Sequence, residues 1–510
     1  MAWGRRTTVS LVLLGLTLAL AVIVPAVLLS HRQARCGPPA FAHAAVAADS
    51  KVCSDIGRGP VDRGARGAPR LRRGPPPPRP PALGAAAPAH HRAAPRGLPH
   101  TPRPQPVPEP QPPAACLESV QPELFFNGTE PLKPQDPLPW PALAATLETV
   151  ATEGAEALYT GRLGRMLVED AAKEGSILTL QDLAEFQPEV VDALQVPLGD
   201  YTLYSPPPPA GGAILGFVLK VLKGFNFSAE SVASPEGSVN MYHHLVETLK
   251  FAEGQRWRLW DPRSHLEVQN ASRDLLGEAF AQHIRQQIDG RGDHQPSHYH
   301  LAGPWGHRMG TAHVSVLAED GSAVAATSTI NTPFGAMVYS PQTGILLNNE
   351  LLDLCWRRRP GPSVTPQPVV KGDRVGGAPG GCWPRIPGER PPSSMVPSIL
   401  INEAQGSKLV IGGAGGELII SAVAQAIMNK LWLGFDLRGA IAAPILHVDS
   451  KGHVSYEPSF SQEVQRGLGE RGQSQAPRPR FLNVVQAVSR EGACVYAASD
   501  ARKRGEAAGY

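Results

Sequence analysis

The stretch from Gly59 to Ala115 constrains the fold most, because it has too few large apolar side chains to bury a core. It contains no Ile, Phe, Tyr, Trp or Met, and runs such as GPPPPRPP are typical of polyproline II or disordered chain. The stretch contains nine arginines but only two acidic residues, Asp62 and Glu109, and this excess accounts for the net charge of +3 of the whole chain. The positive net charge therefore gives no indication of nucleic-acid binding. Any folded core must come from the residues on either side.

An apolar run from Leu11 to Leu29, preceded by Arg5 and Arg6, is long enough to cross a hydrocarbon core of about 30 Å. A cleaved signal peptide is the alternative, but the run is longer than a usual signal-peptide core and no clear small-x-small cleavage site follows it. We therefore expect a cytoplasmic tail at residues 1–9 and a single-pass transmembrane signal anchor at residues 10–30.

Three N-x-[ST] sequons, which begin at Asn127, Asn226 and Asn270, follow this run, as expected if the bulk of the chain is luminal or extracellular. The six cysteines, at positions 36, 53, 116, 355, 382 and 494, have no C-x-x-C spacing, so we predict no metal site. An oxidising compartment would permit disulfides, and Cys355 with Cys382 is one candidate pair.

After Cys116 the sequence again has the pattern of apolar and polar residues that is typical of a folded domain. Apolar residues at helical spacing predict helices over 139–159, 213–225 and 239–260. Past residue 310 the pattern changes to strands, with two β-rich runs at 313–320 and 321–330 that meet at Asp320-Gly321, a strong hairpin signal. Helices and strands in separate blocks predict an α+β fold with a largely antiparallel sheet.

Two further features have an ordinary interpretation that we prefer. The run KLVIGGAGG at 408–416 predicts a strand and a glycine turn before a helix at 421–433, and it lacks the third glycine of a GxGxxG dinucleotide loop. The histidines His294, His298, His300, His307 and His313 have no zinc-ligand spacing, and a polar loop before the strand accounts for them better.

The Gly310-Thr311 pair at the start of the predicted hairpin has two interpretations. A threonine hydroxyl is a poor nucleophile unless a base takes its proton. If the peptide bond before Thr311 were cleaved, the α-amine of Thr311, with a pKa of about 7.7 to 8, would be such a base on the same residue. From spacing alone, an ordinary hairpin remains the default.

Separate segments of the chain closely resemble the gamma-glutamyltransferase family of N-terminal-nucleophile hydrolases. They are GTAHVSVLAEDGSAVAATSTIN, GILLNNELLD, PPSSMVPSI, VIGGAGGE and the terminal ASDARKRGEAAGY, together with AVAADSKVCSDIGR near the start. The resemblance covers roughly residues 1–58 and 119–510. Within the family, the sequence most resembles the leukotriene-C4-preferring branch. It implies an αββα sandwich, with a large-subunit-like region at 31–310 and a small-subunit-like catalytic region at 311–510.

The resemblance also implies a role for each matching residue. Thr311 would attack the γ-glutamyl carbonyl of the donor after autocatalytic cleavage of Gly310-Thr311, and Thr329 would orient that nucleophile. Asn331, Glu350 and Asp353 match the positions that hold the α-amino group of the donor, and an ammonium does need anionic or carbonyl acceptors. Ser393 and Ser394 match the pair that binds the α-carboxylate. Gly415 and Gly416 match the backbone amides that receive the oxyanion.

The implied reaction is cleavage of the γ-glutamyl bond of glutathione and of glutathione S-conjugates such as leukotriene C4, without a cofactor. The acyl-enzyme would pass to water or to an amino-acid or dipeptide acceptor. The resemblance further implies a glycoprotein zymogen of two chains cut from one precursor, a type II protein of the plasma membrane with its catalytic part extracellular.

The chain departs from the family where the stretch 59–115 stands. After Ile56-Gly57-Arg58 there is neither the glycine-rich apolar strand nor the arginine that pairs with the donor's α-carboxylate, and a cysteine partner for Cys53 is missing too. Losing a charge-assisted, typically bidentate partner should weaken donor binding severely. We interpret the stretch as an alternative or mis-predicted reading frame, and we expect this chain to be poorly folded or inactive.

Two other functions compete with a γ-glutamyl enzyme. A non-catalytic membrane glycoprotein of the same fold is favoured by the missing arginine and disfavoured by the intact Thr311, Glu350 and Ser394. Another N-terminal-nucleophile amidase, such as an asparaginase-like enzyme, shares the nucleophile but does not explain the PPSSM and NNELLD motifs.

Overall fold

The computed structural model of the chain describes residues 36, 40–51, 53–55, 122–127, 130–132, 136, 138–268, 270–301, 310–354, 386–477 and 484–510. The predicted anchor, the stretch 59–115, and the candidate pair Cys355 and Cys382 lie outside these residues. Among the helices that are described, none is both long and apolar enough to cross a membrane.

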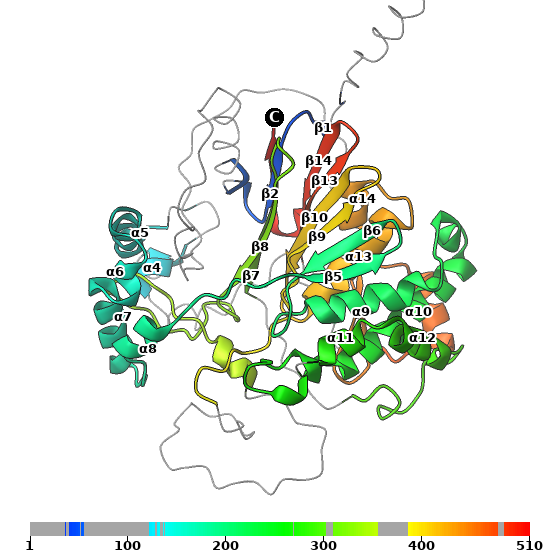
Figure 1. Cartoon of the computed structure of the whole chain (residues 1–510), viewed down its shortest axis with the longest axis horizontal. Coiled ribbons are helices and arrows are strands. Elements are labelled where there is room, and N and C mark those ends of the chain that lie inside the picture. The colour runs from blue at the N-terminus through cyan, green and yellow to red at the C-terminus, as the bar shows by residue number, and fades with distance from the viewer. Residues whose placement is uncertain are drawn as a thin grey trace, which may run out of the picture.

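Two antiparallel sheets form the centre of the molecule (Figure 1). The larger has the strand order β1-β14-β13-β10-β9-β6-β5, and the smaller has the order β15-β2-β7-β8. Their bounds are β1 Ala40–Phe41, β2 Ala45–Ala48, β5 Leu194–Leu198, β6 Tyr201–Ser205, β7 Thr311–Leu317, β8 Ala323–Thr329, β9 Ser398–Asn402, β10 Ser407–Ala414, β13 Val484–Glu491, β14 Cys494–Ser499 and β15 Ala507–Gly509. Two short hairpins pair β3 Phe126–Asn127 with β4 Glu130–Pro131, and β11 Leu446–Val448 with β12 Val454–Tyr456.

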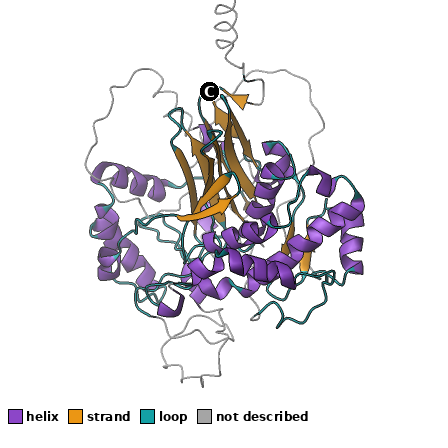
Figure 2. Ribbon diagram, turned by 45° about the vertical axis from the view of Figure 1, so that its right-hand side comes forward, coloured by secondary structure: helices purple, strands orange, loops and turns teal. Residues whose placement is uncertain are grey.

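Helices surround the strands, which gather in the middle of the view in Figure 2. The α-helices are α4 Pro122–Phe125, α5 Pro141–Glu153, α6 Glu156–Tyr159, α7 Arg162–Lys173, α8 Leu180–Glu185, α9 Gly212–Lys223, α10 Pro235–Gly254, α11 Ala271–Leu275, α12 Glu278–Gln287, α13 Leu418–Leu431, α14 Leu437–Ala442 and α15 Gln462–Glu470. Short 3₁₀ helices are η1 Ala229–Val232, η2 Arg256–Leu259, η3 Leu266–Val268, η4 Glu350–Leu354 and η5 Ala501–Lys503.

The predicted helices are confirmed, with different ends. The helix expected over 139–159 is split into α5 and α6, because Gly154 follows α5 with φ of 84°, a backbone conformation that favours glycine. The helix expected over 239–260 starts earlier, at Pro235, where the side chain of Ser234 caps it by accepting from the N–H of Gly237. The predicted hairpin and the β10-to-α13 turn are present as well.

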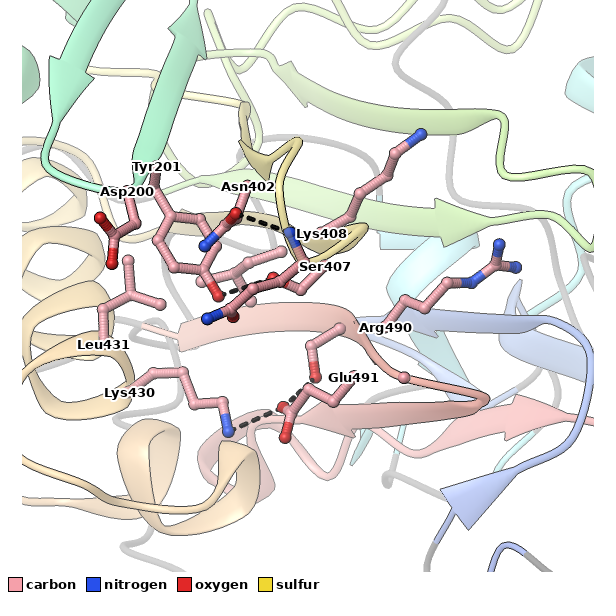
Figure 3. Close-up of a pocket in the computed structure, with 13 residues that line it drawn as sticks. Asp200, Tyr201, Asn402, Ser407, Lys408, Lys430, Leu431, Arg490 and Glu491 are labelled. Carbon is pink, nitrogen blue, oxygen red and sulfur yellow. Dashed lines mark hydrogen bonds and ion pairs between the residues drawn. The ribbon is translucent and has the colours of Figure 1, made fainter. Parts of the chain in front are cut away.

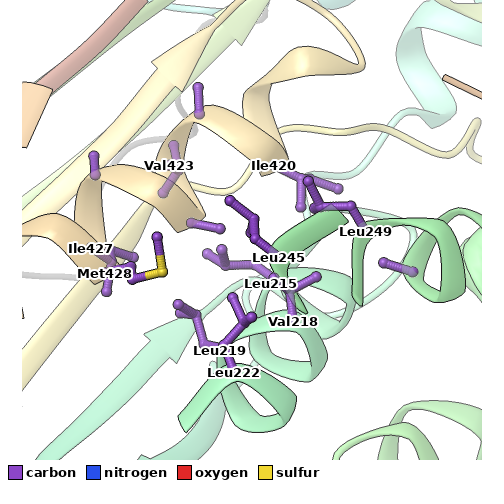
Figure 4. Close-up of a cluster of buried hydrophobic side chains, with 14 of the residues drawn as sticks. Leu215, Val218, Leu219, Leu222, Leu245, Leu249, Ile420, Val423, Ile427 and Met428 are labelled. Carbon is purple, nitrogen blue, oxygen red and sulfur yellow. The ribbon is translucent and has the colours of Figure 1, made fainter. Parts of the chain in front are cut away.

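The main core lies on the outer face of the seven-stranded sheet. Helix α13 is buried along nearly its whole length, because it packs against β10 and β13 on one side and against α9 on the other. Leu215, Leu219, Leu245, Ile427 and Met428 are all fully buried where α9, α10 and α13 meet (Figure 4). Each such side chain stabilises the fold by roughly 1.5–3 kcal/mol through its removal from water.

A smaller core joins the two sheets face to face. Ala45, Ala47 and Leu317 of the four-stranded sheet pack against Val410 and Val488 of the seven-stranded sheet. Side chains alternate along a strand, so Thr311, His313 and Ser315 share the inward face of β7 with Leu317. The first residue of β7 therefore points into the seam between the sheets.

The outer face of the four-stranded sheet is open by comparison. Strand β8 ends the strand order of the described sheet, and Val324, on its outward face, is 54% exposed. No described helix packs extensively on β7 or β8. The αββα sandwich that we expected is thus seen in the described residues with two sheets and one outer helical layer.

A disulfide joins Cys36 to Cys494 and so holds the start of the described chain against β14. Cys53 is exposed and has no disulfide partner among the described residues. The side chains of Asn226 and Asn270 are exposed, as an acceptor for a glycan must be, whereas the side chain of Asn127 lies outside the described set.

Candidate active site

Thr311 begins β7, and its side chain is only 8% exposed. It pairs directly with Thr329, the last residue of β8, across the hairpin. The turn at Asp320-Gly321 fixes this register, since a slip of one strand by one residue would turn the threonine of that strand away from the seam. The hairpin therefore positions the candidate nucleophile, and the two interpretations of Gly310-Thr311 are compatible.

The Thr329 hydroxyl lies between the Thr311 hydroxyl and the peptide bond that precedes it. Thr311 Oγ1 donates to Thr329 Oγ1 at 3.2 Å, and Thr329 Oγ1 donates to the carbonyl oxygen of Gly310 at 3.1 Å. The backbone N–H of Asn331 donates to Thr329 Oγ1 at 2.9 Å and fixes its position. The resulting chain of hydrogen bonds links the candidate nucleophile to the carbonyl group of the residue before it.

Asn331 and Asp353 lie immediately beyond this chain. Asn331 has φ of 73°, in the left-handed region that Asn tolerates better than most residues. Its Nδ2 donates to Asp353 Oδ1 and to the carbonyl oxygen of Asn349, both at 3.2 Å. Glu350 and Asp353 are three residues apart on η4, and this spacing puts both carboxylates on one side of a 3₁₀ helix. The group offers several oxygen acceptors to an ammonium ion.

The loop that carries these acceptors is held by α7. Asp170 accepts hydrogen bonds from the Ser340 hydroxyl at 2.7 Å and from Gln342 Nε2 at 2.9 Å. Although the burial of Asp170 acts in the opposite direction, these bonds and that from Lys173 lower its pKa to about 2. The aspartate is therefore ionised at neutral pH and anchors the loop before η4.

Gly415 and Gly416 directly follow β10, which runs along β7 toward the end where Thr311 lies. Lys408, near the start of β10, donates to the Gly321 carbonyl at the hairpin tip at 2.8 Å, and Gly412 lies against the ring of His313. The glycines that follow have φ of 128° and 61°, conformations that side chains rarely allow, and they lead directly into α13. Backbone amides at a helix N-terminus are suited to an anionic oxygen.

The serine pair lies on the segment before β9. The N–H of Ser393 donates to the Pro209 carbonyl at 2.8 Å, and Ser393 Oγ accepts from the N–H of Met395 at 3.3 Å. Ser394 Oγ accepts from Arg256 Nη1 at 2.7 Å, and Arg256 Nη2 donates to the carbonyl oxygen of Glu417 at 3.2 Å. Ser394 and the glycine turn are thus connected through one guanidinium group.

The predicted residues form two hydrogen-bonded groups. Thr311, Thr329, Asn331 and Asp353 make the first, with Gly310 as its acceptor and Glu350 on the same 3₁₀ helix. Ser394 is in the second, which Arg256 joins to Glu417, the residue next to Gly415 and Gly416. Ser393 adjoins the second group through the backbone.

Sequence reasoning missed three residues that support these groups. Arg256 is one. Lys503 is another, since its Nζ donates to the carbonyl oxygen of Thr311 at 3.1 Å and lies 3.8 Å from Asp49 Oδ2. Burial raises the pKa of Asp49 to about 6, although Lys503 acts to lower it. Asp49 and Lys503 stand in the AVAADS and ASDARKR motifs, and charged residues inside such motifs were the available signal.

His313 lies within β7 and is 3% exposed, so its place in the strand predicted over 313–320 is confirmed, whereas its grouping with the histidines of a polar loop is wrong. Its Nδ1 is 2.8 Å from Thr327 Oγ1 and its Nε2 is 3.0 Å from Ser315 Oγ. Burial lowers the pKa of His313 to about 3, so the imidazole is neutral at pH 7. It serves as a buried hydrogen-bonding side chain beneath the site.

A solvent-open pocket of about 440 Å³ lies at the other end of the hairpin (Figure 3). Its lining includes Lys408, Lys430 and Glu491, and Lys430 Nζ is 2.8 Å from Glu491 Oε1. Lys408 is also the residue that reaches the tip at Gly321, about 20 Å along β7 from Thr311 at roughly 3.4 Å per residue. The pocket is therefore separate from the Thr311 group.

Comparison with families of known proteins assigns residues 111–510 to gamma-glutamyltranspeptidase. The chain belongs to the gamma-glutamyltranspeptidase family. It is 66% identical to human glutathione hydrolase 5 proenzyme, with 100% of both chains covered, and 60% identical to the rat protein of the same name over the same coverage. Glutathione hydrolase 2 of Arabidopsis thaliana is 34% identical over 76% of this chain and 67% of its own length. By family, this chain is an enzyme.

The alignment with the human relative spans 589 positions, whereas this member of the family has 510 residues. The relative therefore has residues without a counterpart here. Among solved structures, cephalosporin acylase from Bacillus halodurans is similar in fold, with a TM-score of 0.62 and 20% identity over 76% of this chain and 66% of that one. This likeness shows that the family member shares the mixed α and β fold of that acylase.

Proposed function

We propose that this gamma-glutamyltranspeptidase family member cleaves the γ-glutamyl bond of glutathione and of glutathione S-conjugates, leukotriene C4 among them. The observation that supports the proposal most is the hydrogen-bonded chain from Thr311 through Thr329 to the Gly310 carbonyl, with Asn331 and Asp353 beside it. A nucleophile next to an ammonium-binding group of acceptors fits a donor whose α-amino group lies a fixed distance from its scissile carbonyl.

The enzyme would first release its own nucleophile. Thr311 Oγ1 attacks the carbonyl carbon of Gly310, and Thr329 donates a hydrogen bond to the carbonyl oxygen as negative charge develops on it. The C–N bond breaks, its nitrogen takes the proton lost by the hydroxyl, and an ester links Gly310 to Thr311. Water then hydrolyses this ester, which leaves a Gly310 carboxylate and a Thr311 with a free α-amine.

The freed α-amine then acts as the base for the donor reaction. Thr311 Oγ1 attacks the γ-glutamyl carbonyl, the amides of Gly415 and Gly416 receive the oxyanion, and the leaving amine departs with a proton. Water or the amino group of an amino acid or dipeptide attacks the resulting γ-glutamyl ester and restores the hydroxyl. No cofactor is needed, since every step is an acyl transfer.

Donor binding would be the weak point of this chain. Asn331, Glu350 and Asp353 hold the α-ammonium, and Ser393 and Ser394 donate to the α-carboxylate. The arginine expected for that carboxylate has no counterpart in the sequence, so the donor loses a charge-assisted pair that is typically worth about 1.5–3 kcal/mol. The sequence alone led us to expect a poorly folded or inactive chain. Because Thr311, Thr329 and the Gly310 carbonyl are hydrogen-bonded in sequence, we propose instead that the chain processes itself but binds donors about 10- to 100-fold more weakly than relatives that have this arginine.

We also propose that the enzyme is a glycosylated type II protein of the plasma membrane with its catalytic part outside the cell. The apolar run Leu11–Leu29 and the exposed side chains of Asn226 and Asn270 support this placement. Deglycosylation of chain expressed in a secretory cell, followed by electrophoresis, tests it, and the absence of any mobility shift would refute the glycosylation.

The activity is tested with purified chain and two chromogenic anilides, one γ-glutamyl and one β-aspartyl. Release from the γ-glutamyl donor alone, at saturating concentration, supports the proposal. Release from the β-aspartyl donor alone would indicate an asparaginase-like amidase instead. A folded chain that is cut before Thr311 but releases nothing from either donor would support the non-catalytic glycoprotein.

A further inference from the structure

Arg256 is a buried cation beside the proposed donor site that no step of the reaction uses. It is the first residue of η2, directly after α10, and is 4% exposed. Its three nitrogens are directed at three different groups. Nε donates to Glu253 Oε1 at 2.8 Å, Nη1 donates to Ser394 Oγ at 2.7 Å, and Nη2 donates to the Glu417 carbonyl at 3.2 Å.

The bond to Ser394 determines what the serine hydroxyl can do. A hydroxyl has one donor and two acceptor lone pairs, and Arg256 occupies one of the lone pairs. The O–H of Ser394 cannot point back at the guanidinium, because a guanidinium has no acceptor. It is therefore directed away from Arg256, where it can donate to an anionic group.

The bond to Glu417 couples this serine to the glycine turn. Glu417 follows Gly416, and its carbonyl belongs to the turn that starts α13. Glu253 fixes the third side of the guanidinium plane, and burial raises the pKa of Glu253 to about 7 although Arg256 acts to lower it. One planar group thus sets the spacing between the serine and the amides of Gly415 and Gly416.

We propose that Arg256 is a positioning residue for the donor's α-carboxylate: it orients the Ser394 hydroxyl toward that carboxylate and holds Ser394 in register with the Gly415-Gly416 turn. The inference rests on the proposed function, because it assigns the α-carboxylate of a γ-glutamyl donor to this end of the site. It also gives the chain a cationic group at the carboxylate end of the site, where the expected arginine is missing.

A lysine cannot replace Arg256 fully. The guanidinium is planar and reaches Glu253, Ser394 and Glu417 along three fixed directions, whereas an ammonium is a single centre on a flexible stem. Arg256→Lys should therefore keep part of the effect, and Arg256→Gln should lose it.

The test compares two small ligands that differ only in the α-carboxylate, L-glutamate and 4-aminobutyrate. Their dissociation constants are measured by calorimetry on the unmodified chain and on Arg256→Gln, Arg256→Lys and Arg258→Gln. The last is a matched control, because Arg258 lies on the same η2, loses the same charge, and donates to the Ala271 carbonyl instead of the site.

We expect the unmodified chain to prefer glutamate, and Arg256→Gln to reduce that preference about 10-fold. Arg256→Lys should give a smaller reduction, and Arg258→Gln should leave the preference unchanged. For the chromogenic γ-glutamyl anilide, Arg256→Gln should raise KM more than it lowers kcat. Equal weakening of both ligands, an unchanged preference, or no preference in the unmodified chain would overturn the inference.

If Arg256→Gln fails to fold, a second comparison tests whether Arg256 acts through Ser394. Arg256→Lys should reduce the preference for glutamate in the unmodified chain but not in a Ser394→Ala chain, because the effect acts through that hydroxyl. The same reduction in both backgrounds would contradict the inference. A preference for glutamate that depends on Arg256, in a chain without turnover, would refute the proposed function and leave the role of Arg256 standing.

Discussion

The two sheets of this protein differ in how their faces are covered. The seven-stranded sheet has α13 packed along it, and α9 and α10 extend that core to residues such as Leu219 that have no exposed surface. The four-stranded sheet shares a small core with it on the inner side, while Val324 on the outer face of β8 is 54% exposed. Both Thr311 and Thr329 belong to this second, more open sheet.

Most of the stability and the proposed chemistry therefore belong to different parts of the molecule. The large core holds β10 and α13, and with them the Gly415-Gly416 turn, in place. The β7–β8 hairpin carries the proposed nucleophile, Thr311, and is held mainly through its inner face. Substitutions should therefore separate into those that remove chemistry from a stable chain and those that remove stability from both sheets.

Loss of the nucleophile should have the largest effect. Thr311→Ala should abolish cleavage before residue 311 and reduce γ-glutamyl anilide hydrolysis to background, because no hydroxyl remains to form either ester. Its thermal unfolding should match that of the unmodified chain. A Thr311→Ala chain that is still cut at this bond would show that another protease makes the cut.

Removal of the Thr329 hydroxyl comes next. Thr329→Val keeps the shape but leaves the Gly310 carbonyl without its donor, and we expect self-cleavage to slow about 10²- to 10³-fold, as for other oxyanion donors. Thr329→Ser is the matched control and should cleave at close to the original rate. The comparison is made by following the self-cleavage of both variants over time, starting from uncleaved chain. Equal rates for Thr329→Val and Thr329→Ser would contradict the role of the Thr329 hydroxyl.

The large core should respond to a single truncation. Leu219→Ala removes a fully buried side chain where α9 meets α13 and should lower the free energy of unfolding by about 2–5 kcal/mol. Urea unfolding measures the change. A loss below about 1 kcal/mol would mean that this core contributes less than its burial indicates.

His313, in the seam between the sheets, should make the free energy of unfolding depend on pH. Its pKa is about 3 in the folded chain and about 6.5 when unfolded, so protonation favours the unfolded chain and stability is lost as pH falls below about 6.5. The loss should approach about 1.4 kcal/mol per pH unit down to about pH 3. His313→Gln cannot take up this proton, so its unfolding free energy should fall less steeply over the same range, and parallel profiles would contradict the neutral buried imidazole.

The smallest effect is expected on the open face of β8. Val324→Thr changes a side chain that is 54% exposed and should alter the free energy of unfolding by no more than about 0.5 kcal/mol. Urea unfolding beside Leu219→Ala makes the comparison direct. A loss as large as that of Leu219→Ala would show that the outer face is covered in solution.

The local parts of this structure were predictable from the sequence. Asp320-Gly321 fixes a hairpin, and the hairpin alone places Thr311 opposite Thr329. The run from β10 through Gly415 and Gly416 into α13 follows from apolar spacing and two glycines. In each case the residues that decide the structure are neighbours in the chain.

The remaining parts depend on contacts between distant segments. Arg256 is 138 residues from Ser394 in the chain. An arginine is common at the end of an amphipathic helix, so nothing local distinguishes Arg256. Lys503 reaches the Thr311 carbonyl from a position 192 residues later in the chain. His313 begins the strand predicted over 313–320, but we also grouped it with the polar-loop histidines, and its burial in the seam between the two sheets was not predictable from those neighbours. No local pattern encodes which strands face each other.

N-terminal sequencing of the fragments of purified, folded chain tests the account most directly. We predict a C-terminal fragment that begins at Thr311, because hydrogen bonds already connect the Thr311 hydroxyl through that of Thr329 to the Gly310 carbonyl. A folded chain that stays uncut at this bond, or a fragment that begins at another residue, would contradict it.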